Sequence, residues 1–246
     1  MRVIECATPA EVAVVAAHHV IESAPRVLGV ATGSTPVDTY CELVARGGLG
    51  PTTLLAQLDE YVGLPVDHPQ RYVNVLRRQL LEPLGLPDTA LLGPDVDAVD
   101  LAAAAVAYEQ RLAAAGGVDL QVLGIGRNGH IGFNEPGTPF DSRTRVTHLA
   151  ASTRADNARF FGSADEVPAQ VVTQGIATVL GARALLLLAV GAAKAPAIAA
   201  MIDRPRTTDV PASALVDHPR LTIVADRAAL STVSRTAILT PHLEYR

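Results

Sequence analysis

Short apolar runs alternate along the chain with segments whose apolar positions follow helical spacing. The first pair consists of the segment PAEVAVVAAHHVIES at 9–23 and the run RVLGVA at 26–31. Such alternation is typical of repeated β–α units around a mostly parallel sheet. We expect further strands at 53–58, 118–125, 184–190 and 220–225, and further helices ending near 46 and spanning about 70–82, 98–115 and 193–202.

We find no internal repeat, no low-complexity tract and no linker long enough to divide the chain. A length of 246 residues, of which 49% are hydrophobic, suits one large α/β domain with a substantial core. We therefore predict a single domain over residues 1–246, built as a Rossmann-like, open, mostly parallel β-sheet with helices on both faces.

Polar residues cluster where the expected strands end. TGSTP follows residue 31, the polar loop DEYVGLPVDHPQRY follows residue 58, GRNGH follows the strand at 118–125, and GAAK follows residue 190. The carboxyl ends of parallel strands lie at one edge of a sheet, and ligands of open α/β sheets bind at that edge. The four clusters therefore predict one binding crevice.

The stretch LGIGRNGHIGFNEPG at 123–137 contains the pattern G-x-G-x-x-G, which ends at Gly129. In a dinucleotide-binding site the third glycine opens a helix whose N-terminus faces the pyrophosphate. Here Gly129 is followed within ten residues by two more glycines and by Pro136 and Pro139, which a helix does not tolerate. The sequence therefore argues against a nucleotide cofactor.

The same stretch carries side chains suited to acid–base chemistry. Asn128 and Glu135 are close enough in sequence to contact the ring of His130. A histidine exchanges protons near neutral pH, and a carboxylate that holds its ring orients it for general acid–base catalysis. The alternative for a histidine taken alone is a structural role, and its two polar neighbours favour the functional interpretation.

Two carboxylates, Asp59 and Glu60, directly follow the expected strand at 53–58. One of them should point into the crevice at the sheet edge, while a helix cap or a solvated loop position is the alternative for each. The spacing of histidines, cysteines and carboxylates does not match a metal site.

A phosphate cradle is indicated by the stretch ATGSTP, which precedes an expected helix. The backbone N–H groups and hydroxyls of Thr32, Gly33 and Ser34 are suitable phosphate donors. Lys194 is the only lysine of the chain and lies at the start of another expected helix, where it could add a compact positive charge. Together with a carboxylate and His130, this set suits proton transfer on a small phosphorylated molecule.

Charge and composition narrow the partners. A formal net charge of −5, a pI near 5.8 and only 4% aromatic residues disfavour nucleic acid and anionic membranes. The most apolar stretch, ARALLLLAVGAAKA, is too short to span a bilayer, and the N-terminus shows no signal peptide pattern. We expect a cytoplasmic protein in which Cys6 and Cys41 are ordinary thiols.

Several motifs together resemble the glucosamine-6-phosphate deaminase family, within the wider group that includes 6-phosphogluconolactonases. The matching stretches occur in family order and span the chain to about residue 230. They are LGVATGSTP, LDEYVGLPVDHPQRY, LGIGRNGHIGFNEPG, SRTR, ARFF and LAVGAAKA. Lactonases are similar at the glycine-rich turn but typically lack the FNEP continuation, so Glu135 favours a deaminase.

The resemblance implies conversion of glucosamine 6-phosphate and water to fructose 6-phosphate and ammonium, as in the catabolism of amino sugars, with no cofactor or metal. Asp59 would move a proton between C2 and C1 through an enolamine intermediate. His130 would assist opening of the sugar ring, with Glu135 holding it.

The resemblance also assigns the binding of the substrate. The loop with Gly33 and Ser34, together with Arg159 and Lys194, would hold the phosphate. Residues around 150–169 resemble the family's mobile lid, which would shield the reactive intermediate from water.

Two departures from the family pattern matter. Many members carry aspartate where this chain has Asn128, whose amide oxygen can still accept the ring N–H but carries no charge. Allosteric hexameric members have a lysine at the position of Thr147. Thr147 weakens the expectation of activation by N-acetylglucosamine 6-phosphate and of a hexamer, and we expect a monomer or small homo-oligomer.

Three alternatives stay open at this point. The substrate could be another hexosamine phosphate, such as galactosamine 6-phosphate, because a few hydroxyl contacts separate the two sugars. The chain could be a 6-phosphogluconolactonase, or a sugar-phosphate-sensing domain of a transcriptional regulator. The acidic composition and the absence of a basic helix-turn-helix disfavour the regulator.

Overall fold

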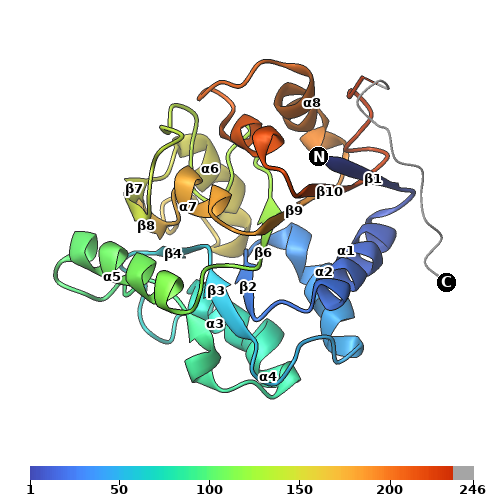
Figure 1. Ribbon diagram of the computed structural model, residues 1–246. Helices are drawn as coiled ribbons and strands as arrows, with labels where there is room; N and C mark the ends of the chain where they lie inside the picture. The colour runs from blue at the N-terminus through green and yellow to red at the C-terminus, as the bar shows by residue number, and fades with distance from the viewer. Residues whose placement is uncertain (235–246) are drawn as a thin grey trace.

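The computed structural model describes residues 1–234, and its centre is a seven-stranded sheet whose neighbouring strands all run parallel. Figure 1 shows this sheet crossing the molecule, with β1 at one edge. The strand order is β1 (Arg2–Cys6), β10 (Leu221–Asp226), β9 (Ala184–Ala189), β6 (Leu120–Gly124), β2 (Val27–Val30), β3 (Leu54–Gln57) and β5 (Leu91–Leu92).

The strands are apolar on both faces because each face is covered by helices. In β9, Leu185 and Leu187 pack into one hydrophobic core, whereas Leu186 and Leu188 pack into the other. The first core is completed by α5 (Leu101–Ala114), α7 (Ile176–Leu180) and α8 (Ala195–Asp203), and the second by α1 (Pro9–Ser23), α2 (Ser34–Ala45) and α3 (Tyr72–Leu76). The predicted open, mostly parallel sheet with helices on both faces is confirmed.

Side chains that precede the long helices explain where those helices begin. The hydroxyl of Thr8 accepts a hydrogen bond from the backbone N–H of Glu11 at 3.2 Å, at the start of α1. The carboxylate of Asp100 accepts one from Ala103 at 2.9 Å, at the start of α5. Such caps satisfy backbone N–H groups that have no partner within the helix.

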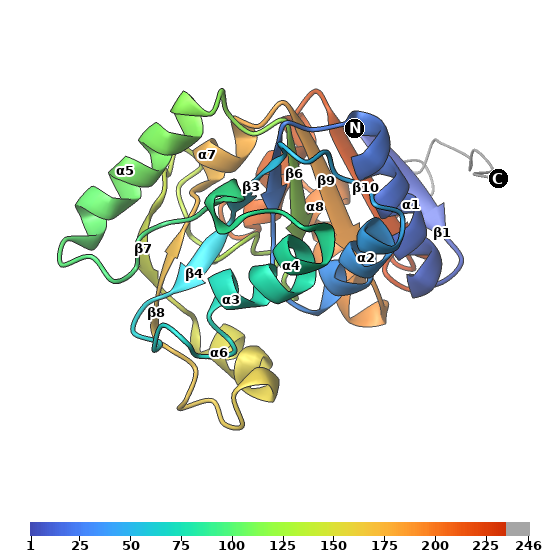
Figure 2. The ribbon, with the colours of Figure 1, turned by 90° about the horizontal axis from the view of Figure 1, so that it is seen from below.

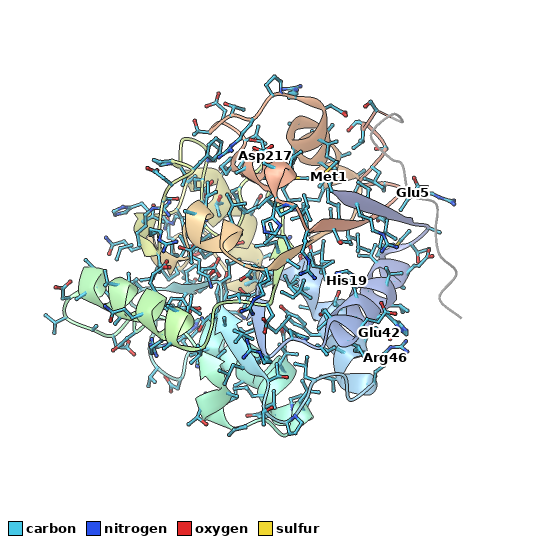
Figure 3. The ribbon with its side chains drawn as sticks, viewed as in Figure 1. Met1, Glu5, His19, Glu42, Arg46 and Asp217 are labelled. Atoms are coloured by element: carbon cyan, nitrogen blue, oxygen red, sulfur yellow. The ribbon has the colours of Figure 1, made fainter. Side chains whose placement is uncertain are left out.

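At the surface of α2, Glu42 and Arg46 form an ion pair one turn apart (Figure 3).

The sheet has a topological switch point between β2 and β6, which are neighbours in the sheet. From β2 the chain passes through α2 on one face to β3, and after β6 it reaches β9 through α7 on the opposite face. The loops after β2 and β6 therefore diverge and leave a crevice at the carboxyl ends of these strands. This crevice is where the sequence predicts the binding site.

A second, antiparallel sheet was not expected from the sequence. It joins β4 (Asp59–Tyr61), β8 (Gln170–Thr173) and β7 (Arg145–His148), in that order. The expectation that the polar loop starts at residue 59 is therefore wrong for its first three residues. They are polar but buried, because β8 pairs with them and supplies Thr173 opposite Asp59.

The helix expected near 70–82 is one continuous helix over 72–84 with a wide turn in its middle. It consists of α3, a π-helical turn over Arg77–Leu81, and α4 (Glu82–Leu84). Pro83 lacks the N–H that would bond to the carbonyl of Gln79, so the regular bonding pattern cannot continue through this point.

The segment that contains α6 (Ala151–Asn157) projects from the body of the molecule next to the small sheet (Figure 2). Leu149, Phe161 and Val167 from this segment pack with Tyr61 and Phe133 in a separate apolar cluster. Within residues 1–234, no helix combines the length and apolarity that a bilayer-spanning helix needs.

Candidate active site

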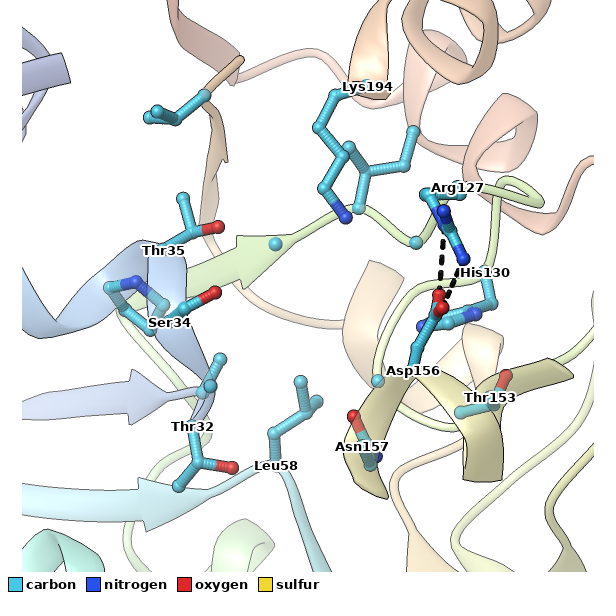
Figure 4. A pocket seen from close by; sticks show the side chains of 18 of the residues that line it. Thr32, Ser34, Thr35, Leu58, Arg127, His130, Thr153, Asp156, Asn157 and Lys194 are labelled. Atoms are coloured by element: carbon cyan, nitrogen blue, oxygen red, sulfur yellow. Dashed lines mark hydrogen bonds and ion pairs between the residues drawn. The ribbon is translucent and has the colours of Figure 1, made fainter. Parts of the chain in front are cut away.

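A cavity of about 520 Å³ lies at the carboxyl edge of the main sheet, where the sequence predicts it. Its walls come from the loops after β2, β6 and β9, from β4, and from α6 and the residues that follow it. Figure 4 shows Thr32 and Ser34 on one side of this cavity and Arg127, His130 and Asp156 on the other, with Lys194 above them.

Asp59 brings a carboxyl group from β4 to the cavity wall. The residue is only 4% exposed, and its carboxyl oxygens have no hydrogen-bond or ion-pair partner among residues 1–234. Burial, together with the nearby charge of Glu60, raises the pKa of Asp59 from its ordinary value of 3.8 to about 8. A carboxyl group of this kind can release and regain a proton near neutral pH.

The neighbouring Glu60 is buried to a similar degree but is fully bonded. Its carboxylate accepts hydrogen bonds from the backbone N–H groups of Tyr61, Tyr72 and Val73 at 2.8–2.9 Å, and from the amide of Gln57 at 2.9 Å. Burial raises the pKa of Glu60, while these four donors oppose that shift. The residue caps α3 and fixes the start of that helix against β4, so its role is positional rather than chemical.

His130 lies in the loop after β6 and is held by two polar side chains. The amide oxygen of Asn128 lies 2.7 Å from Nδ1 of His130 and also accepts the backbone N–H of His130 at 3.2 Å. The amide nitrogen of Asn128 donates to Oε2 of Glu135 at 2.8 Å. The carboxylate of Glu135 can only accept and the backbone N–H of His130 can only donate, so the amide group of Asn128 has a single orientation, with its oxygen toward His130. Nδ1 of His130 must therefore carry the ring proton in order to donate to that oxygen. Nε2 is then the unprotonated ring nitrogen.

Glu135 is a partly buried carboxylate whose hydrogen-bonded surroundings contrast with those of the unpaired Asp59. Thr153 of α6 donates its hydroxyl to Oε1 at 2.5 Å, and Nδ1 of His130 lies 3.6 Å from Oε2. Burial alone would raise the pKa of Glu135, but His130, Thr153 and Asn128 together lower it to about 2. Glu135 therefore stays charged at neutral pH.

The glycine-rich turn makes room for the histidine ring. A Cβ on Gly126 would lie 2.2–2.5 Å from three atoms of the His130 ring, so only glycine fits at this position. No helix occurs between residues 125 and 144, as the prolines and glycines in this stretch predict. The G-x-G-x-x-G pattern thus carries a histidine rather than opening a helix toward a pyrophosphate.

The opposite end of the cavity is rich in donors and cations. α2 begins at Ser34 after Gly33, whose φ of +106° favours glycine, and the first turn of this helix lines the cavity. Arg159 donates to the hydroxyl of Ser34 at 3.1 Å. Burial lowers the pKa of Lys194, which lies in the turn after β9. Such a combination is suited to a phosphate group.

Seven of the nine residues that the sequence predicts for the site line this one cavity. They are Thr32, Gly33, Ser34, Asp59, His130, Arg159 and Lys194. Asn128 and Glu135 do not line it, and instead lie behind His130 and hold its ring.

Seven further polar residues line the cavity although the sequence pattern does not predict them: Thr35, Asp38, Tyr72, Arg127, Thr153, Asp156 and Asn157. Thr153 and Asp156 fall within the expected lid segment, and Arg127 lies in the stretch that carries His130, so their positions were the only available signal. Nothing in the pattern around Tyr72 distinguishes it from a core aromatic residue. Residues 1–234 contain no group of three or more histidine, cysteine and carboxylate side chains that could hold a metal ion.

These features define a class of protein: a parallel α/β protein with an unpaired carboxyl group, an oriented histidine and a cationic subsite in one cavity. The chain belongs to the family described as glucosamine-6-phosphate isomerases/6-phosphogluconolactonase, whose sequence profile matches residues 7–224.

Individual relatives agree with this assignment. Glucosamine-6-phosphate deaminase of Streptomyces avermitilis is 56% identical over 209 residues, which cover 83% of this chain and 80% of that protein. The solved structure of a monomeric glucosamine-6-phosphate deaminase matches 94% of this chain and 100% of that chain, with a TM-score of 0.90 and 40% identity. A 6-phosphogluconolactonase of Trypanosoma brucei matches 95% of this chain and 98% of that one, with a TM-score of 0.75 and 21% identity, and shares the fold.

Proposed function

We propose that this chain is a glucosamine-6-phosphate deaminase, which converts glucosamine 6-phosphate and water to fructose 6-phosphate and ammonium. The observation that carries the proposal is the buried, unpaired carboxyl group of Asp59 in the same cavity as an oriented histidine and a cationic subsite. The names of its relatives support the substrate, since the chain is similar to glucosamine-6-phosphate deaminases over most of its length.

Asp59 acts as the general base in this proposal. Its carboxylate removes the proton from C2 of the open-chain sugar, the aldehyde oxygen at C1 takes up a proton that the 2-ammonium group releases, and the electron pair of the C2–H bond forms the double bond of an enolamine. The same carboxyl group returns the proton to C1, which leaves a C2 iminium that water hydrolyses to the ketone and ammonium. A base whose pKa lies near the working pH can both take and return a proton, and the pKa of about 8 meets that requirement.

His130 acts on the ring form of the sugar. Because Asn128 holds the proton at Nδ1, the free Nε2 can accept a proton from the C1 hydroxyl and pass it to the ring oxygen as the ring opens. Positive charge then develops on the imidazole, and Glu135, whose pKa is about 2, stabilises that charge from 3.6 Å. Asn128 and Glu135 are positioning residues for this step.

The phosphate of the substrate binds at the other end of the cavity in this proposal. Backbone N–H groups at the start of α2 and the side chains of Ser34, Arg159 and Lys194 hold it. The segment around 150–169 acts as a lid, because it supplies Thr153 to the histidine end and Arg159 to the phosphate end.

The test measures ammonium and fructose 6-phosphate released from glucosamine 6-phosphate, with and without N-acetylglucosamine 6-phosphate. We expect both products in equal amounts and no activation. The Asp59→Asn variant should lose turnover but still bind the sugar phosphate. In parallel assays, galactosamine 6-phosphate should release ammonium more slowly, and 6-phosphogluconolactone should be hydrolysed more slowly. A faster reaction with either compound would replace the proposed substrate.

The oligomeric state and cellular location also belong to the proposal. One relative of known structure is a monomeric deaminase, which supports a monomer here. The proposed substrate of this chain is an anionic sugar phosphate. Sugar phosphates are metabolites of the cytoplasm, so we infer a cytoplasmic enzyme. Light scattering during size-exclusion chromatography should give a mass near 25.7 kDa, and a mass of twice that value or more would contradict the monomer.

A further inference from the structure

One ion pair of the cavity wall has no part in the mechanism described above. Nε of Arg127 donates to Oδ2 of Asp156 at 3.0 Å, and a second nitrogen of the same guanidinium donates to Oδ1. Figure 4 shows this two-pronged contact between the loop after β6 and helix α6. Both side chains line the cavity, and the side chain of Arg127 is 60% exposed.

The order of strands places Arg127 between the two halves of the cationic subsite. β6 lies between β2 and β9 in the sheet. The loop after β2 carries Ser34, the loop after β6 carries Arg127, and the turn after β9 carries Lys194. A guanidinium in the central loop is therefore within the row of donors that faces this end of the cavity.

The charges of this region are matched to an anion. Lys194 is influenced electrostatically by Arg127, Arg159 and Asp156, so all four charged groups act on one space. Three cations and one carboxylate leave two positive charges, and a phosphate monoester carries about −1.5 to −2 at neutral pH. In the structure, Asp156 is the anion that Arg127 binds.

We propose that Arg127 is a further phosphate-binding residue and that Asp156 competes with the phosphate for its guanidinium. When the phosphate enters, Arg127 exchanges its two hydrogen bonds with the Asp156 carboxylate for hydrogen bonds with phosphate oxygens, which have the same acceptor geometry. The inference rests on the phosphate subsite of the proposed function, and it adds a residue and a competing anion to that subsite.

The competing explanation is that the pair only fastens α6 to the body of the protein. The two explanations predict effects of different sign. If the ion pair only holds α6 in place, removing either partner makes α6 more mobile, so both substitutions weaken phosphate binding. If Asp156 competes with phosphate, neutralising Asp156 strengthens phosphate binding, whereas neutralising Arg127 weakens it.

The experiment titrates the whole protein with inorganic phosphate by calorimetry, in a buffer without other multivalent anions. We expect Arg127→Gln to weaken phosphate binding about tenfold, the effect of losing one charge-assisted contact. Asp156→Asn should strengthen binding by roughly three- to tenfold. The double variant should bind phosphate as weakly as Arg127→Gln alone, because Asp156 acts through Arg127.

A matched control is available outside the cavity. Arg77 and Asp88 form a similar two-pronged pair, at 3.0 and 3.3 Å, outside the cavity, so Arg77→Gln and Asp88→Asn should leave phosphate binding unchanged. Weaker binding in both Arg127→Gln and Asp156→Asn, unchanged binding in Arg127→Gln, or additive effects in the double variant would overturn the inference. Ammonium release by the wild-type protein decides the proposed function separately, whatever the phosphate titrations give.

Discussion

Replacing Asp59 by asparagine should stabilise the protein increasingly as the pH rises. The side chain is 4% exposed and its carboxyl oxygens have no partner within residues 1–234, so its ionised form is costly in the fold. Asparagine has the same shape and cannot ionise. Active-site carboxyl groups of this kind lower stability in exchange for reactivity.

The magnitude follows from the pKa of Asp59, which is about 8 in the folded protein against an ordinary value of 3.8. Because the folded protein holds this proton more tightly than the unfolded chain does, the contribution of the protonated group to stability is complete below about pH 4 and is lost as the pH rises to about 8. Each pH unit in this interval removes about 1.4 kcal/mol from the free energy of unfolding. Between about pH 5 and pH 8 the free energy of unfolding of the wild-type protein should therefore fall by about 4 kcal/mol relative to that of Asp59→Asn.

Urea unfolding at several pH values measures this difference directly. All other ionisable groups are common to both proteins, so the difference between their free energies of unfolding isolates Asp59. An unpaired amide at this position adds a constant offset but no dependence on pH. The exposed Asp67, replaced by asparagine, is the control and should retain the wild-type slope. Parallel curves for the wild type and Asp59→Asn would refute the assignment of Asp59 as a buried, protonated acid.

Three further predictions concern the two ends of the cavity. Glu135→Gln offers one acceptor oxygen where Thr153 and Asn128 now bond to two, so ammonium release from glucosamine 6-phosphate should fall by about 10²–10³ with little change in KM; an unchanged kcat would contradict its orienting role. Asn128→Asp places a second carboxyl group 2.8 Å from Oε2 of Glu135, so one of these two carboxyl groups must keep a proton. The pH–rate profile of the variant should therefore gain an ionisation that the wild type lacks. Superimposable profiles of the two proteins would contradict this prediction. Lys194→Met should raise the KM for the sugar phosphate about tenfold without lowering Tm, because burial already lowers the pKa of this lysine; a lower Tm at unchanged KM would assign it a structural role instead.

The sequence predicts the central sheet well because its strands carry apolar residues on both faces. β9 is a run of leucines and alanines that begins at the expected residue, and β2, β3, β6 and β10 lie within two residues of their expected bounds. Both faces are buried under helices, so the signal in these strands does not depend on knowing which face is inside. The edge strand β1, with the short run RVIEC, was missed because its partner β10 lies more than 200 residues away.

The second sheet could not be predicted from local patterns. β4 has the sequence DEY and β7 the sequence RVTH, which read as polar loop. Their pairing with β8 depends on residues that are more than twenty positions away along the chain. The same limit applies to the site: Asp59 was expected at the crevice, but its burial and lack of partners follow from β8 and the His130 loop closing around it.

Helix α6 connects the two ends of the cavity, so binding at one end can order side chains at the other. Thr153 bonds to Glu135 behind the histidine. Arg159, two residues after the end of α6, bonds to Ser34 at the proposed phosphate end. The segment is short and continuous, so a phosphate that fixes Arg159 also restricts Thr153. The hydroxyl of Thr153 is one of the donors that keep Glu135 charged and in place against His130. In the proposed function, binding energy from the phosphate, which takes no part in the chemistry, is therefore available to orient the acid–base group, and a sugar without its phosphate should lose turnover as well as affinity.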